Sequence, residues 1–149
     1  MAESAPSTQS NCLVPEDLRA FMLDNMVENN LLDLDLVWSE QEILNAMRRC
    51  AMMYNGSEPL SSSLNIKTLA LPNAYVFLVG TAYQLYLSKL MNYQRNDMEY
   101  TTGGVKASIF GNRIKHFTGM IQYLREEFKE LANSRKTSQN LSNAWGVIG

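Results

Sequence analysis

The chain has 149 residues, of which 46% are apolar and 19% charged, which suits one globular domain with a single core and excludes a disordered chain. Two cysteines, Cys12 and Cys50, are too few for a disulfide scaffold, and the polar first residues predict no signal peptide, so we expect a reducing compartment.

The charge is divided between the two halves of the chain. Residues 1–60 hold three arginines and ten acidic residues, a net charge of −7, whereas residues 61–149 hold ten basic and five acidic residues, a net charge of +5. Opposite charges of this kind favour head-to-tail contact between copies, which closes into rings or continues as filaments. The alternative is that folding mixes the two halves and removes the polarity.

The first elements are predicted from helix-start signals. Residues 1–13 are small and polar for most of their length and predict a flexible arm. A short helix is predicted from Pro15, because proline suits the first helical position and Glu16 and Asp17 follow in the first turn. From 26 to 38 apolar and acidic residues alternate, as in a strand or an extended segment, and we expect the extended segment.

Two further helices are predicted in the middle of the chain. Ser39-Glu40-Gln41-Glu42 has the pattern of a capping box, and Asn55-Gly56 supplies a left-handed residue to end that helix. Residues 68–88 carry no charge, which is long enough to raise the question of a membrane span. Polar residues within the run favour instead a central helix buried on most sides, with Pro72 near its start.

The last third of the chain contains the strongest periodic pattern. Tyr100 to Phe110 surrounds Gly103-Gly104, and a hairpin and a loop are equally compatible with it. A long helix follows, because its apolar residues recur at alternating steps of three and four: Ile114, Phe117, Ile121, Leu124, Phe128 and Leu131. The fold class is therefore predicted as mainly α, a bundle of about four helices over residues 14–136, with extended arms at 1–13 and 137–149.

The sequence shows no pattern typical of a catalytic or metal site. His116 is the one histidine, so neither a zinc site nor a serine triad is indicated by spacing. Gly103-Gly104 lacks the lysine of a phosphate-binding loop, and Asp33 and Asp35 are too few for a calcium loop. We therefore expect no enzyme activity, cofactor or metal, and a hydrolase is the least supported alternative.

Several short motifs are similar to those of one viral family. They occur over most of residues 14–136 and include Pro15-Glu16-Asp17-Leu18-Arg19, Asn30-Leu31-Leu32, Trp38-Ser39-Glu40-Gln41-Glu42-Ile43, Tyr54-Asn55, Leu71-Pro72 and Arg95-Asn96-Asp97-Met98-Glu99-Tyr100-Thr101-Thr102-Gly103-Gly104-Val105. In these motifs the chain resembles structural proteins of the tailed-bacteriophage neck, the head-to-tail connector or adaptor proteins.

This resemblance implies a virion protein, assembled in the host cytoplasm, that forms a ring of copies between the portal and the tail. Its partners would be copies of itself, the portal protein and other neck or tail proteins, with DNA passing through the lumen without sequence-specific binding and with no membrane. Candidate assembly contacts are Trp145, Val147, Ile148, Asp33, Asp35, Arg135 and Lys136, and candidate residues facing the DNA channel are Lys106, Arg113 and Lys115.

Two alternatives remain open at this level. Nine methionines, including Met47, Met52 and Met53, are compatible with a small helical adaptor or chaperone-like protein that holds a partner helix in a Met-rich groove. The chain is also compatible with another virion component, of the tail or baseplate.

Overall fold

The protein is mainly helical, as predicted. The computed structural model describes residues 11–25, 36–97, 99–108 and 111–146. Within these ranges it contains four helices, α1 (Pro15–Met22), α2 (Glu40–Gly56), α3 (Tyr75–Asn96) and α4 (Gly111–Gly146), and two strands, β1 (Glu99–Thr102) and β2 (Val105–Ser108).

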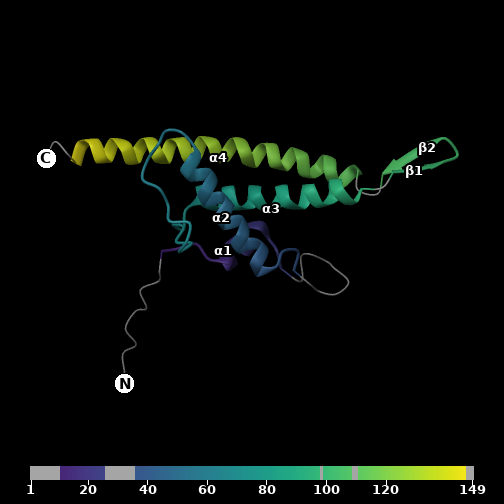
Figure 1. Cartoon of the computed structure of the whole chain (residues 1–149), viewed down its shortest axis with the longest axis horizontal. Coiled ribbons are helices and arrows are strands. Elements are labelled where there is room, and N and C mark those ends of the chain that lie inside the picture. Colours follow the sequence, from purple (N-terminus) through teal and green to yellow (C-terminus); the bar gives the residue numbers. More distant parts are fainter. Residues whose placement is uncertain (1–10, 26–35, 98, 109–110, 147–149) are drawn as a thin grey trace, which may run out of the picture.

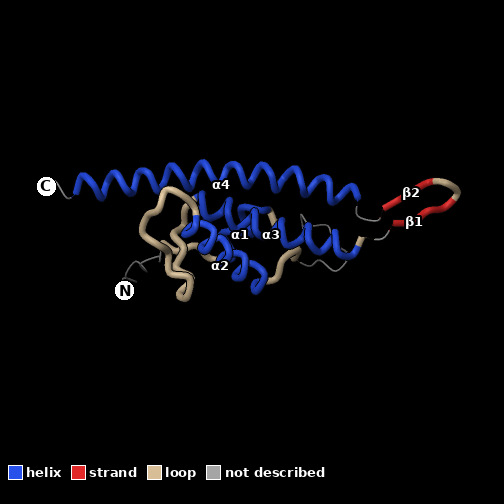
Figure 2. The backbone as a smooth tube through the Cα atoms, turned by 45° about the horizontal axis from the view of Figure 1, so that its top comes forward, coloured by secondary structure: helices blue, strands red, loops and turns tan. Residues whose placement is uncertain are grey.

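Helix α3 lies at the centre of the bundle (Figure 1). α4 runs antiparallel along it, while α2 crosses it and α1 packs against both α2 and α3. The two long helices are joined at one end by β1 and β2, which reach beyond the bundle, and at the other end α4 continues past α3 (Figure 2). The molecule is therefore elongated, with different structures at its two ends.

The apolar faces of the helices form the core. The face of α2 that includes Ile43, Met47 and Tyr54 is buried, and so is most of the first half of α3, which explains the uncharged run without a membrane. None of the helices in the described ranges combines the length and apolar character that crossing a membrane requires. The predicted apolar seam of α4 is confirmed, since Ile121, Leu124 and Phe128 are buried.

Helix starts follow the sequence signals. The predicted capping box is present, because Ser39 Oγ accepts from the Glu42 N–H at 3.2 Å and Glu42 Oε2 accepts from the Ser39 N–H at 2.7 Å. At the end of α2 the prediction was wrong, because the left-handed residue expected there is absent and Ser57 follows Gly56 with an extended backbone. Here the Ser57 N–H and hydroxyl both donate to the Tyr54 carbonyl, so this end needs no left-handed glycine.

For Tyr100 to Phe110 the sequence was compatible with a hairpin or a loop, and the described residues of this segment belong to a hairpin. Strands β1 and β2 are antiparallel, with Thr102 opposite Val105, so Gly103 and Gly104 form a two-residue connection. Both glycines have positive φ, 60° and 81°, as a type I′ turn requires.

The two predicted arms differ from expectation where the structure describes them. Leu13 is buried and its N–H donates to the Leu71 carbonyl at 2.7 Å, so the end of the N-terminal arm is fixed to the bundle. At the other end α4 continues without a break to Gly146, so residues 137–146 are helical and not extended. These residues include no glycine or proline before Gly146, so no residue that strongly disfavours a helix interrupts α4 earlier.

A candidate assembly surface at the end of the long helix

The last part of α4 is attached to the rest of the protein along one face. Asn140 Nδ2 donates to the Leu60 carbonyl at 2.9 Å, and the Tyr54 hydroxyl donates to Gln139 Oε1 at 3.4 Å. After these contacts residues 141–146 are all exposed. The helix therefore leaves the bundle with one face bound and the other faces free.

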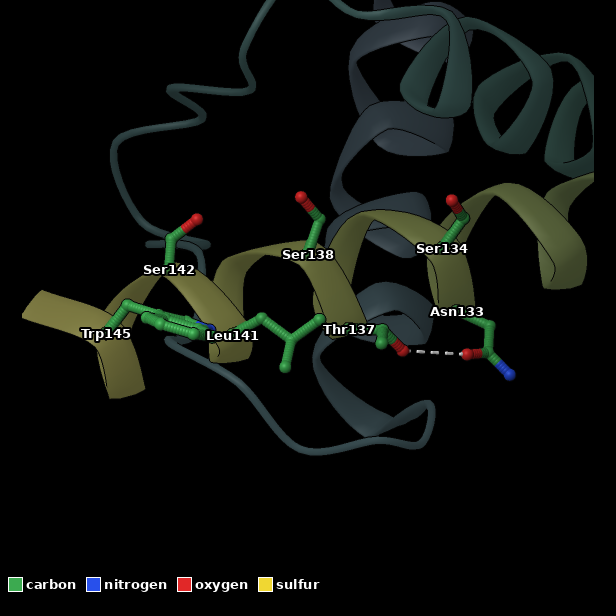
Figure 3. Close-up of a pocket in the computed structure, with 7 residues that line it drawn as sticks. All are labelled: Asn133, Ser134, Thr137, Ser138, Leu141, Ser142 and Trp145. Carbon is green, nitrogen blue, oxygen red and sulfur yellow. Dashed lines mark hydrogen bonds between the residues drawn. The ribbon is translucent and has the colours of Figure 1, made fainter.

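The free face carries an exposed apolar pair. Trp145 is 74% exposed and Leu141 is 55% exposed, and at a spacing of four residues they lie next to each other on the helix. Figure 3 shows Leu141 and Trp145 in line with Asn133 and Thr137, and a second row of three serines beside them. We call this the terminal surface, and its residues are Asn133, Ser134, Thr137, Ser138, Leu141, Ser142 and Trp145.

The terminal surface offers contact area and hydrogen bonds. Thr137 Oγ1 donates to Asn133 Oδ1 at 3.1 Å, which leaves the amide nitrogen of Asn133 and the serine hydroxyls available to a partner. The one histidine, His116, precedes Ser134 by 18 positions on the same helix, or about 27 Å, so it does not activate these serines. Within the described ranges no cluster of histidine, cysteine and acidic side chains is suited to a metal ion.

Lys136 is not an assembly contact, which corrects the prediction. The side chain is only 1% exposed, and its ammonium donates to the carbonyls of Tyr54 and Ser57 at the end of α2. The Nζ atom also lies 4.6 Å from the centre of the Tyr54 ring, and burial lowers the pKa of Lys136 below its usual value. The lysine is used within its own chain.

Arg135 is partly buried and lies against the core, so its prediction as an assembly contact remains a prediction. Its guanidinium carbon lies 5.3 Å from the centre of the Phe77 ring, in the core, and its Nε atom is buried. The long apolar stems of both side chains fill space between α4 and the helices α2 and α3, and the buried Nε of Arg135 has no hydrogen-bond partner among the described residues.

The predicted channel residues lie far from the terminal surface. Arg113 and Lys115 are exposed in the first turns of α4, near the hairpin, and the Arg113 guanidinium carbon lies 5.9 Å from the centre of the Tyr93 ring. Lys106 belongs to β2, and its side chain lies outside the described part. Asp33, Asp35, Val147 and Ile148 also lie outside the described residues, so those predictions remain predictions.

Cys50 has a thiol, a group that can act as a nucleophile, but it is buried in the core. Burial raises the pKa of this thiol to about 12, more than the side chain of Thr81 lowers it, so the thiol is protonated at neutral pH, and its sulfur lies 3.8 Å from the Phe77 carbonyl oxygen. It therefore acts as a small apolar side chain.

Sequence reasoning missed two features of the surface. Leu141 precedes Trp145 by four residues, a spacing that would have paired them once the segment was recognised as helical. The second feature is a hollow between α2, α3 and α4, whose walls come from distant parts of the chain and so leave no local pattern. We call it the basic hollow, and its residues are Met53, Gly56, Ser57, Tyr83, Arg125, Phe128 and Lys129.

The fold and its surfaces define a mainly helical protein with an antiparallel helix pair and an exposed apolar helix end. Comparisons with protein-family models, with curated proteins and with solved structures found no match.

Proposed function

We propose that this protein is a structural subunit of a tailed-phage neck, which forms a ring that joins the portal to the tail around the DNA channel. The observation that carries the proposal is the exposed pair of Leu141 and Trp145 on a helix end that leaves the bundle. Large exposed apolar side chains that lie together are typical of protein contact sites. The motif resemblance supplies the viral context.

The shape of the molecule supports contacts with two different neighbours. α4 has 36 residues and α3 has 22, so α4 is longer by about 21 Å. The hairpin lies at one end of this pair and the terminal surface at the other (Figure 2). A subunit of a neck needs such separate contacts, because it must bind one component on each side as well as copies of itself.

The position of Arg113 and Lys115 is compatible with a channel. Both are exposed at the hairpin end of α4, where the positive charge of several copies would add around a lumen. Attraction of this kind is independent of DNA sequence and weakens with salt, as expected for DNA that must move.

The alternative of a Met-rich groove is less well supported. Met47 is buried in the core, Met52 is exposed at 58%, and Met53 alone of the three lines the basic hollow. The three methionines therefore do not form one surface for a partner helix.

The proposal is tested by particle incorporation. We expect the double substitution Leu141→Ala with Trp145→Ala to reduce the amount of the protein in purified phage particles about tenfold or more, because the anchors of a contact contribute most of its binding energy. Incorporation is measured by quantitative mass spectrometry of particles, and circular dichroism checks that the helical content of the purified variant is unchanged.

Tyr123→Ala is the matched control, since Tyr123 is also an exposed aromatic residue on α4, at 60% exposure, outside the terminal surface. It should leave incorporation unchanged. Absence of the wild-type protein from particles, or normal incorporation of the double variant, would contradict the proposal.

A further inference from the structure

The basic hollow combines an apolar floor with a positive rim. Met53 from α2, Tyr83 from α3 and Phe128 from α4 supply the apolar part, and Arg125 and Lys129 supply the charges. Its volume is about 320 Å³. Such a site suits a ligand that presents apolar groups and carboxylates together.

Neither Arg125 nor Lys129 forms a buried ion pair among the described residues. Among the described residues Arg125 has no hydrogen-bond or ion-pair partner, and Lys129 contacts only Glu126, at 3.5 Å, in a pair whose side chains are both exposed. An exposed pair of this type contributes little to stability. Both cations can therefore turn to an incoming carboxylate at small cost.

The chain itself contains a segment with the complementary pattern. Leu32-Asp33-Leu34-Asp35 alternates leucine and aspartate, and residues 26–35 include three acidic residues and no basic residue. In an extended conformation this alternation presents leucines on one side and carboxylates on the other. The hollow likewise offers both apolar side chains and two cations.

This segment joins the fold at the end of α2 opposite the hollow. Asp24 is buried and its Oδ1 accepts from the Val37 N–H at 2.9 Å, so the chain returns at Val37 to the place it left at Asp24. Met53 and Gly56 lie 13 and 16 residues beyond the first residue of α2, about 20 to 24 Å along the helix.

We propose that the segment Leu32–Asp35 of one copy binds in the basic hollow of a second copy. The leucines pack on Met53, Tyr83 and Phe128, and the two aspartates pair with Arg125 and Lys129. Each copy has one segment and one hollow, so the contact is heterologous and repeats into a ring or filament. The inference rests on the proposed function only in requiring that copies meet.

Charge reversal with complementation tests the contact. The variant Arg125→Glu with Lys129→Glu and the variant Asp33→Lys with Asp35→Lys should each lower the self-association constant about tenfold or more, because like charges then face each other. An equimolar mixture of the two variants should associate again, since each hollow meets an opposite segment. Light scattering during size-exclusion chromatography measures the mass.

A matched control carries the same change in charge elsewhere. Arg48→Glu with Lys67→Glu alters two exposed cations outside the hollow and should leave the association constant within about twofold of wild type.

Three results would overturn the inference: a wild-type chain that stays monomeric at high concentration, charge-reversed variants that associate normally, or a mixture that does not recover. If reversal of Arg125 and Lys129 blocks particle incorporation but not self-association, the hollow binds a different protein and the inference is also wrong. The proposed function is tested separately, by incorporation into particles through the terminal surface, and of these results only a wild-type chain that stays monomeric also counts against the proposed ring.

Discussion

Lys136 connects two elements that are far apart in the sequence. The last carbonyl groups of a helix have no partner within the helix, and at the end of α2 the Lys136 ammonium donates hydrogen bonds to the carbonyls of Tyr54 and Ser57. The charge is costly to bury, as the lowered pKa of Lys136 indicates, but hydrogen bonds to carbonyls and the Tyr54 ring offset that cost.

We expect Lys136→Met to lower the free energy of unfolding by about 1 to 2 kcal/mol, because the stem is retained while the carbonyls of Tyr54 and Ser57 lose the ammonium donor, although Ser57 still donates to the Tyr54 carbonyl. Urea denaturation followed by circular dichroism measures the change. Lys129→Met on the same helix removes an exposed ammonium and should change stability by less than about 0.5 kcal/mol. Equal effects of the two substitutions would show that the Lys136 hydrogen bonds contribute nothing.

At the scale of elements, Gly80 determines how closely the helices approach. A Cβ atom at this position would lie 2.6 Å from both Cys50 Sγ and Phe128 Cε2, which belong to α2 and α4. The absence of a side chain on α3 thus allows both neighbours to pack on it at the same level. Gly119 on α4 provides a contrast, because a Cβ atom there would have no neighbour within 4 Å.

Substituting alanine at these two glycines should have opposite effects. Gly80→Ala should destabilise the protein by about 1 to 3 kcal/mol through overpacking, and Gly119→Ala should stabilise it by about 0.5 to 1 kcal/mol because alanine loses less backbone entropy in a helix. Thermal and urea unfolding of both variants measure this. A stabilising Gly80→Ala would mean that α2 and α4 move apart at no cost.

Local signals predicted the elements well, and contacts between distant residues account for what they missed. The capping box at Ser39 and the apolar seam of α4 are properties of short windows, so they were predictable. The burial of Lys136 depends on Tyr54, 82 residues earlier, and no window contains both. Trp145 was predicted as an assembly contact because it is an apolar residue near the polar end of the chain, but its neighbour Leu141 was missed because the segment was expected to be extended.

At the scale of the whole molecule, the basic helix α4 and the helix α1 lie on different sides of α3 (Figure 1). α4 has six basic and three acidic residues, and Figure 1 places it along one side of α3 with α1 on the other. Of the ten acidic residues in the first 60, four lie in residues 1–10 and 26–35. Because Lys136 is buried, the remaining charged residues of α4 are five basic and three acidic, a net charge of +2.

Salt should separate the two kinds of contact that we propose. Exposed charges are screened over about 10 Å at 0.1 M ionic strength and about 3 Å at 1 M, so self-association through Arg125 and Lys129 should weaken steadily as sodium chloride rises from about 0.05 to 0.5 M. The apolar contact of Leu141 and Trp145 is not screened and should persist. Sedimentation velocity of the purified protein measures the first, and retention of the protein in salt-washed particles measures the second. Self-association that does not change with salt would contradict a charge-based contact between copies, because burial of apolar side chains alone would then hold the copies together. In that case the variant Arg125→Glu with Lys129→Glu should associate as strongly as the wild type.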